Sequence, residues 1–176
     1  MLVTASQMVE LLQLKPHPEG GFFRETYCAT TMVATPRGER PAGTAILFLV
    51  TDESVSKLHR LPGDELWAFQ GGLPLELMTI APDGSVTLRV LGSPQESLMP
   101  GSELKRSDSL LQAMVAAGSW QGARLVGGPH LPAERAWALV GCFCAPGFDI
   151  SDLELGDRET LTAVYPEHAE IISTLT

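Results

Sequence analysis

An imidazole and a carboxylate lie on either side of a tight turn, and together they are the strongest candidates for chemistry in this sequence. His59 precedes the run Pro62-Gly63-Asp64, and Glu65 follows it. Proline fixes φ, glycine frees it and aspartate supplies a short acceptor, so this run favours a turn between two strands. Residues on either side of such a turn can meet on one face of an antiparallel pair. His59 and Glu65 could therefore share a metal ion, share a proton or hydrogen-bond each other.

A second set of candidates lies on a strand that follows a pair of glycines. Residues 22–27 alternate, which gives two faces: Phe23, Glu25 and Tyr27 on one, and Phe22, Arg24 and Thr26 on the other. Burial among aromatic rings would raise the pKa of Glu25 unless a cation lies beside it. A surface ion pair between Arg24 and Glu25 is the alternative. We expect His17 to be a turn residue that packs at the mouth of the fold.

Strand-like runs make up most of the chain and must position these candidates. They lie at 44–50, 56–72 (two strands about the turn), 74–80, 85–91 and 137–144, with short strands around Gly118 and a possible short strand at 97–99. Asp83-Gly84 is the strongest hairpin signal. Helical patterns are confined to 4–14, 158–164 and 167–174. Residues 30–43 and 127–132 are predicted as loops, and the first could act as a lid.

This pattern indicates an all-β class, because short strands and frequent glycine and proline outnumber the helical segments. We predict one domain over residues 1–176, built as a barrel or a double-sheet jelly roll, with a short N-terminal helix and short C-terminal helices.

Composition limits the partners and the cellular compartment that we expect. The chain has 176 residues, of which 44% are hydrophobic and 19% charged, as in a globular domain with a core. Its net charge of -9 repels phosphate backbones, so we expect no nucleic-acid partner. Neither a membrane span nor a secretory signal is visible, so we predict no membrane partner and a cytoplasmic location. The cysteines, Cys28, Cys142 and Cys144, fit a reducing compartment, and the last two would share a buried strand face.

The spacing of the candidates resembles the two motifs of the cupin superfamily. The first motif is matched by His59, Glu65 and Gly71-Gly72, and the second by the run 117–121, AGSWQ. More closely, the chain resembles an uncharacterised bacterial and fungal branch of the RmlC-like cupins, through HPEGGFFRETY at 17–27 and through 58–67, 117–121 and 139–149. The resemblance implies a cupin jelly roll, a homodimer that shares edge strands, and no settled activity.

The chain departs from the metal-binding cupin pattern at two ligand positions. Lys57 stands at the first histidine of H-x-H, and Gln121 stands at the closing histidine of the second motif. The ligands that remain would be His59, Glu65 (or Asp64) and Gln121. An amide is a poor ligand for zinc or iron, and an inward Lys57 would repel a cation. We therefore predict no cofactor, with a divalent metal at these residues as the alternative.

A second resemblance suggests a mechanism. GFFRETY at 21–27 is similar to a strand of the dTDP-4-keto-sugar 3,5-epimerases, and His59 falls where those metal-free cupins carry a catalytic histidine. The resemblance implies that His59 removes a proton next to a carbonyl group, oriented by Glu65, or by Asp149 or Asp152. Glu19 and Gly20 stand where that family has a phosphate-reading arginine. A sugar- or keto-acid-like ligand is therefore expected rather than a dTDP-sugar, with Arg24, Lys57, Arg60 or Arg124 as anion partners.

Three functions follow from these patterns. The first is a metal-free isomerase or epimerase with His59 and Glu65 as its catalytic pair. The second is a protein that binds a small molecule without changing it, and the third is a metal-dependent cupin enzyme. In each case the predicted ligand-binding residues are Phe23, Arg24, Glu25, Lys57, Trp67, Phe69 and Gln121, although Trp67 and Phe69 could equally belong to the core.

Overall fold

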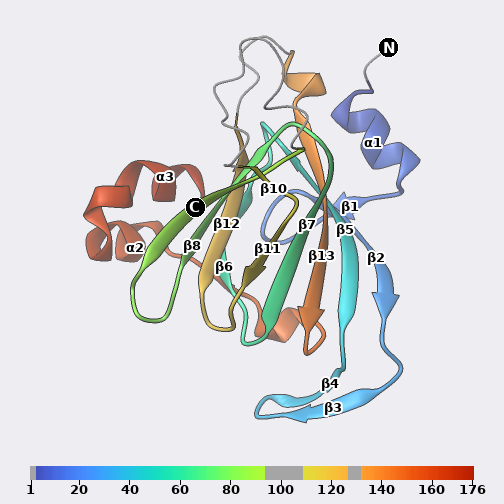
Figure 1. Ribbon diagram of the computed structural model, residues 1–176, viewed down its shortest axis with the longest axis vertical. Helices are drawn as coiled ribbons and strands as arrows, with labels where there is room; N and C mark the ends of the chain where they lie inside the picture. The colour runs from blue at the N-terminus through green and yellow to red at the C-terminus, as the bar shows by residue number, and fades with distance from the viewer. Residues whose placement is uncertain (1–2, 94–108, 127–131) are drawn as a thin grey trace.

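Two packed β-sheets with short helices outside them form the fold (Figure 1). The computed structural model describes residues 3–93, 109–126 and 132–176. Within them, the first sheet has the order β1 (Lys15–Pro16), β2 (Phe22–Cys28), β5 (Thr44–Thr51), β13 (Trp137–Ala145), β7 (Asp64–Gly72) and β11 (Gln112–Val115). The second has the order β10 (Ser109–Leu110), β9 (Val86–Leu91), β8 (Leu75–Ile80), β12 (Trp120–Leu125), β6 (Ser56–Arg60) and β14 (Glu154–Leu155). The predicted all-β jelly roll is confirmed.

Two apolar clusters hold the sheets in place. The larger one fills the space between the sheets, and alternate residues of β13 face it, including Cys142 and Cys144. The prediction that these cysteines share a buried face is confirmed. The smaller cluster lies on the other face of the second sheet, where Leu58 packs with the helices α2 (Arg158–Val164) and α3 (Ala169–Thr174) (Figure 1). The strand that carries His59 is therefore covered on both faces.

The terminal helices follow the sequence signals with one difference. α1 (Ala5–Leu11) starts at Thr4, whose hydroxyl accepts the Gln7 N–H in a capping box. It is shorter than the predicted 4–14, and Leu11 at its end is 71% exposed. The predicted C-terminal helices are confirmed, with a 3₁₀ turn, Pro166–His168, ahead of α3.

The segment predicted as a loop at 30–43 forms a two-stranded hairpin. β3 (Met32–Thr35) pairs with β4 (Gly38–Pro41), and the Thr35 hydroxyl donates to the Gly38 carbonyl across the turn. The hairpin projects from the end of the sheets (Figure 1). The prediction failed because the hairpin lies mostly outside the core, so no alternation of apolar and polar residues marks its strands. The loop predicted at 127–132 and the possible strand at 97–99 fall, except for Pro132, outside the described residues.

A β-bulge in β6 sets the direction of the side chains that matter most. His59 pairs with Gln121 of β12 and Ser56 pairs with Ala123, so Lys57 and Leu58 together oppose Gly122. The extra residue lets Ser56 and His59 both face inward, while Lys57 is exposed. Lys57 therefore does not occupy the inward position that the H-x-H pattern predicts for it. Simple alternation would have placed Lys57 and His59 on the same face.

The bulge depends on the missing side chain of Gly122. A Cβ atom there would lie 3.0 Å from the Leu58 nitrogen and 3.1 Å from the Ser56 oxygen, both backbone atoms. We expect Gly122→Ala to lower the free energy of unfolding by about 1–3 kcal/mol, as overpacking does elsewhere. Gly92→Ala is the matched control, because its Cβ would make only ordinary contacts of 3.4 Å or more with Pro74. Urea denaturation measures both, and equal stabilities would contradict the role of Gly122.

Candidate functional site

Between the two sheets, near the turn at 61–63, lies a cavity of about 50 Å³, called here the inner cavity. Its walls combine acidic, thiol and apolar side chains from the first sheet, from the loop before β2 and from the turns that precede β7 and follow β13. They are His17, Glu19, Phe23, Glu25, Thr44, Ile46, Leu61, Glu65, Cys142, Cys144 and Phe148.

Glu19 is the site residue that the sequence prediction assigned no role. Its side chain is buried, the Ser56 hydroxyl donates to its Oε1 at 3.0 Å, and its Oε2 lies 3.3 Å from His59 Nε2 and 3.4 Å from His17 Nδ1. The following glycine makes this possible: Gly20 has a φ of +97°, and a Cβ there would lie 2.2 Å from the Val55 oxygen. The glycine pair after Glu19 was therefore the available signal that the loop folds inward.

Both ring nitrogens of His59 have a partner in the structure. Its Nδ1 lies 2.8 Å from the Lys57 carbonyl oxygen, so Nδ1 carries a proton and donates it. Nε2 faces Glu19, and the residue is 1% exposed. Glu19, rather than the predicted Glu65, Asp149 or Asp152, is the carboxyl group that contacts the imidazole. Asp149 accepts from Ser151, and Asp152 binds Arg40, which leaves both engaged elsewhere.

Glu65 belongs to a second chain of buried hydrogen bonds. Gln121 donates through its amide nitrogen to Glu65 Oε2, and the Trp67 indole donates to Gln121 Oε1 at 2.9 Å. Trp67 has no exposed surface and meets Phe48 edge to face, so it is a core residue that positions Gln121 rather than a wall of the cavity. Glu65 itself lines the cavity, as predicted from its place after the turn.

Burial shifts the pKa values of these groups toward their uncharged forms. It raises the pKa of Glu19 to about 8, against the hydrogen bond from Ser56. Burial also raises the pKa of Glu65 to about 7, where the nearby His59 opposes the shift and Glu19 adds to it. Burial lowers the pKa of His17 to about 4 and that of His59 below its usual value. At neutral pH Glu19 therefore holds its proton, both imidazoles are uncharged and Glu65 is close to half-ionised.

The two buried thiols remain protonated beside these carboxyl groups. Cys144 pairs with Glu65 across β13 and β7, and Cys142 is the next residue on the same face. Burial raises the pKa of both thiols, and the neighbouring carboxylates raise them further. They are therefore poor nucleophiles, since only the thiolate attacks readily.

The strand that begins at Phe22 supplies part of the predicted set. Phe23 and Glu25 line the inner cavity, but Glu25 is exposed at its rim rather than buried among aromatic rings. A β-bulge between Glu25 and Tyr27 breaks the predicted alternation and leaves Tyr27 52% exposed. His17 packs edge to face on Phe23 at 4.6 Å between ring centroids, which fits the predicted position at the mouth.

The remaining predicted ligand-binding residues do not line the inner cavity. Arg24 is half-buried and precedes Glu25 on the strand, so its side chain takes the opposite face. Phe69 packs against the main core, and Lys57 is exposed outside it. Gln121 lies behind Glu65 and reaches the cavity only through that carboxyl group.

The donor atoms do not fit the metal site that the cupin pattern would place here. Gln121 presents its amide nitrogen to Glu65, while its oxygen accepts the Trp67 proton. His59 donates at Nδ1 and meets Glu19 at Nε2. In the described part of the chain, no three side chains of His, Cys, Asp or Glu are grouped so that they could hold a metal ion. A site shared by His59, Glu65 and Gln121 would need all three to turn.

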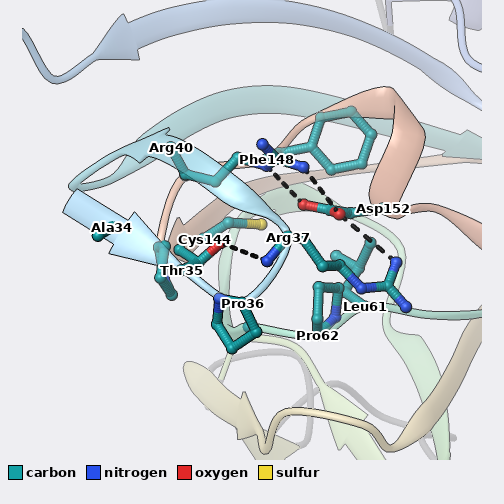
Figure 2. Close-up of a pocket in the computed structure, with 13 residues that line it drawn as sticks. Ala34, Thr35, Pro36, Arg37, Arg40, Leu61, Pro62, Cys144, Phe148 and Asp152 are labelled. Carbon is teal, nitrogen blue, oxygen red and sulfur yellow. Dashed lines mark hydrogen bonds and ion pairs between the residues drawn. The ribbon is translucent and has the colours of Figure 1, made fainter. Parts of the chain in front are cut away.

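A larger pocket of about 300 Å³, called here the outer pocket, lies beneath the β3–β4 hairpin (Figure 2). Leu61, Cys144 and Phe148 line both this pocket and the inner cavity. The two spaces are therefore neighbours that share part of their walls, and a small molecule in the outer pocket would contact side chains that also line the inner one.

The buried carboxyl groups make stability depend on pH in a defined direction. Their pKa values in the folded protein lie above the ordinary value of 4.5, so above that pH the folded state binds more protons than the unfolded state. The free energy of unfolding therefore falls as the pH rises, until the pH has passed about 7 and 8. His17 has the opposite effect, but only below pH 6.5. Between pH 6.5 and 8 we expect the free energy of unfolding to fall by about 2 kcal/mol.

Replacing Glu19 by its neutral isostere tests whether this residue causes the fall in the free energy of unfolding. Glu19→Gln should remove more than half of the fall, because an amide can donate to His59 and accept from Ser56 without titrating. Glu159→Gln, at an exposed position of α2, should leave the fall unchanged. Chemical denaturation at several pH values measures all three proteins. An undiminished fall in Glu19→Gln would contradict the assignment.

In the described residues no helix is both long and apolar enough to cross a membrane. The predicted homodimer and the predicted cytoplasmic location stay predictions.

Two solved structures resemble this chain over nearly its whole length. A hypothetical protein from Leishmania major is 33% identical, with a TM-score of 0.82 and 98% of each chain covered. Protein SO0799 from Shewanella oneidensis is 31% identical, with a TM-score of 0.79, covering 98% of this chain and 97% of that one. A cupin 2 domain-containing protein from Halorhodospira halophila is 15% identical, with a TM-score of 0.52 over 88% of this chain and 83% of its own, and shows the fold alone.

The family assignment rests on a sequence model. A comparison with curated proteins gives no match. A family model described as Cupin superfamily (DUF985) matches residues 6–156, a range that includes every residue lining the two spaces described above. The chain therefore belongs to the DUF985 family of the cupin superfamily.

Proposed function

We propose that this cupin binds a small carbonyl compound and moves a proton on it without a metal ion, with Glu65 as the group that takes the proton. The observation that carries the proposal is the position of Glu65. Its carboxyl group lines the inner cavity, whereas His59, the base that the epimerase resemblance suggests, lies behind Glu19.

The environment of Glu65 suits a base that works near neutral pH. The groups around it in the described structure are a neutral amide, two protonated thiols, the uncharged His59 imidazole and the Glu19 carboxyl group. With a pKa of about 7, Glu65 is partly ionised at neutral pH and stronger as a base than an ordinary glutamate. General bases of this kind are tuned by burial in many enzymes.

Glu19 supplies the complementary acid. It lines the same cavity and, with a pKa of about 8, holds its proton when Glu65 has lost one. Two carboxyl groups with separated pKa values are a common arrangement for acid and base roles. Glu65 would remove the proton from the carbon next to the carbonyl group while Glu19 gives its proton to the carbonyl oxygen. Return of a proton to the other carbon, or to the other side, completes an isomerisation or an epimerisation.

His59 then acts as a positioning residue. Its Nε2 carries no proton while Nδ1 donates to Lys57, so it can accept from the protonated Glu19 carboxyl group 3.3 Å away and orient that group before its proton is transferred. His59 is thus coupled to the chemistry through Glu19, and it does not touch the compound.

Proton exchange with solvent tests the proposal directly. In D₂O, the protein should speed the loss of the proton signal next to the carbonyl group of 4-methyl-2-oxopentanoate or dihydroxyacetone phosphate, followed by NMR. Glu65→Gln should lower this rate by about 10²–10⁴-fold, the usual contribution of a general base. Glu159→Gln is the control, since it removes an exposed carboxyl group far from the cavity. Undiminished exchange in Glu65→Gln would refute the role of Glu65.

Binding of either compound without exchange would favour the alternative of a non-catalytic binding protein. The small inner cavity and its apolar walls of Phe23, Ile46 and Phe148 motivate that alternative. Thermal stabilisation by the ligand would then be the only effect observed.

Removal of metal ions tests the part of the proposal that says the proton is moved without a metal ion. Protein purified without a metal-affinity tag and dialysed against a chelator should keep its melting temperature and its exchange rate. The reason is that hydrogen bonds within the protein already occupy His59 and Gln121. Stoichiometric metal that is lost in His59→Ala would contradict this and support the metal-dependent alternative.

A further inference from the structure

The outer pocket has a charge that is unusual for this chain. Among the described residues that line it, the ionisable side chains with a fixed charge at neutral pH are Arg37, Arg40 and Asp152. Their sum is one positive charge, in a protein whose net charge is -9. Asp149 adds a negative charge beside Arg40 without lining the pocket. A positive group in the pocket of an acidic protein attracts anions locally while the rest of the surface repels them.

An ion pair between Arg40 and Asp152 neutralises two of these three charges. Arg40 binds Asp152 with two hydrogen bonds, Nε to Oδ2 at 2.8 Å and Nη2 to Oδ1 at 3.1 Å (Figure 2). Both side chains are nearly buried, at 12% and 8% exposure, and the Arg40 hydrogen bonds hold the pKa of Asp152 below its usual value. This pair also ties the β3–β4 hairpin to the turn Ile150–Asp152, so it fixes the roof of the pocket.

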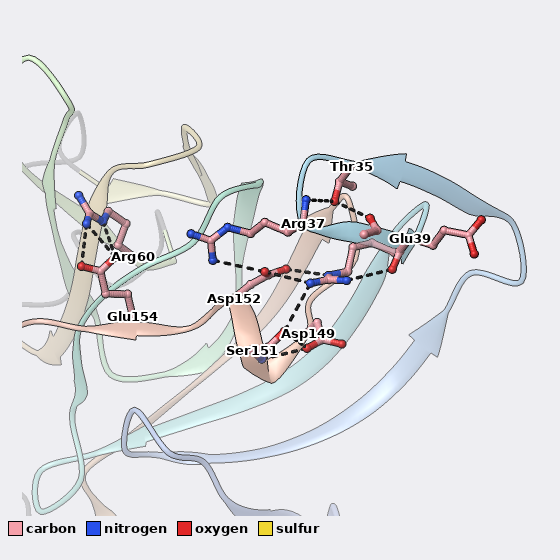
Figure 3. A network of polar contacts seen from close by, with 10 residues as sticks. Thr35, Arg37, Glu39, Arg60, Asp149, Ser151, Asp152 and Glu154 are labelled. Carbon is pink, nitrogen blue, oxygen red and sulfur yellow. Dashed lines mark hydrogen bonds and ion pairs between the residues drawn. The ribbon is translucent and has the colours of Figure 1, made fainter.

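Arg37 is the charge that remains. Its Nη1 donates a long hydrogen bond of 3.5 Å to Asp152 Oδ1 (Figure 3), so Asp152 is shared with Arg40, and the Arg37 side chain is 55% exposed. The turn of the hairpin positions Arg37, because the Arg37 N–H donates to the Thr35 hydroxyl and Gly38 follows with a φ of +106°. Figure 2 shows Arg40 and Arg37 both approaching Asp152 from the hairpin. A guanidinium group held in this way can bind a carboxylate or phosphate through two N–H groups.

The rest of the outer pocket is apolar. Leu61, Pro62, Pro146 and Phe148 form much of its wall, and its volume of about 300 Å³ is at the lower end of the range for small-molecule sites. Leu61 and Phe148 also line the inner cavity. A compound with an anionic group at Arg37 and an apolar body against these side chains would direct its other end toward Glu65.

We propose that the outer pocket binds small carbonyl compounds that carry one carboxylate or phosphate group, with Arg37 as the residue that recognises the anion. The reacting end of the compound would lie in the inner cavity, and this part rests on the function proposed for Glu65. The arginines and lysine first considered as anion partners do not line the pocket. Arg60 binds Glu154, Arg124 binds Glu76, and Lys57 is exposed elsewhere.

Two matched pairs of compounds test the recognition of charge. The first is 4-methyl-2-oxopentanoate against 4-methylpentan-2-one, which lacks the carboxylate; the second is dihydroxyacetone phosphate against dihydroxyacetone. We expect the wild-type protein to bind an anion at least about tenfold more tightly than its neutral partner in calorimetric or NMR titrations. The pair that shows the larger ratio tells carboxylate from phosphate. Equal binding of both members of each pair, or no binding of either anion at millimolar concentration, would overturn the inference.

Variants assign the effect to one residue. Arg37→Gln should reduce the affinity for the anion to that for the neutral compound, about tenfold or more, without changing the neutral compound's affinity. Arg37→Lys should restore part of it, because the charge returns without the planar fork. Arg158→Gln removes a positive charge from α2 and should change neither. Full anion affinity in Arg37→Gln would overturn the inference, and circular dichroism verifies that each variant is folded.

The exchange assay on the same samples keeps this inference separate from the proposed function. Binding that depends on Arg37 without deuterium exchange would refute proton transfer at Glu65 and leave the anion site standing. Exchange that is equal for anionic and neutral compounds, and unchanged in Arg37→Gln, would refute the anion site and leave proton transfer standing.

Discussion

In the part of the chain that the structure describes, two carboxyl groups are buried without a cation beside them, and the rest of this site depends on that constraint. Glu19 and Glu65 face one small cavity, and their partners are a hydroxyl, an amide and uncharged imidazoles and thiols. An ionised carboxylate in such surroundings is unfavourable, so each group keeps its proton to a higher pH than in water. The same desolvation that lowers stability at high pH makes these groups able to exchange protons near neutrality. Stability and proposed chemistry are therefore two consequences of one environment.

Backbone irregularities bring these groups together. The positive φ of Gly20 turns the loop so that Glu19 points inward, and the bulge in β6 turns Ser56 and His59 toward it. A regular strand would have exposed one of the two, and Glu19 would then lack either its hydroxyl donor or its imidazole partner. The close approach of Gly122 to the bulge shows that β12 is adapted to it. The site is thus built from departures from regular geometry on a regular sheet.

These departures also explain how far the sequence could be interpreted. Alternation and the Asp83-Gly84 turn predict the main strands, because a half-buried sheet imposes a period of two on its side chains. The expectation that His59 and Glu65 face each other on one antiparallel pair was wrong, because β6 and β7 lie in different sheets and the imidazole contacts Glu19 instead. The predictions that Lys57 faces inward and that Tyr27 shares a face with Phe23 and Glu25 were wrong. A bulge shifts every later side chain to the other face and leaves no local signal in the sequence. Glu19 could have been found only from the demand of Gly20 for a conformation that other residues avoid.

Gln121 occupies the strand position at which the second cupin motif has a histidine. It pairs with His59 across β12 and β6, where the cupin pattern would place a second imidazole. Its amide instead joins the Trp67 indole to Glu65, which uses both ends of the group and leaves the carboxyl oxygen of Glu65 with a neutral donor. A histidine there would compete for the proton of Glu65, and a metal ion would lower the pKa of that carboxyl group. An amide at this strand position is therefore compatible with the proton transfer proposed for Glu65.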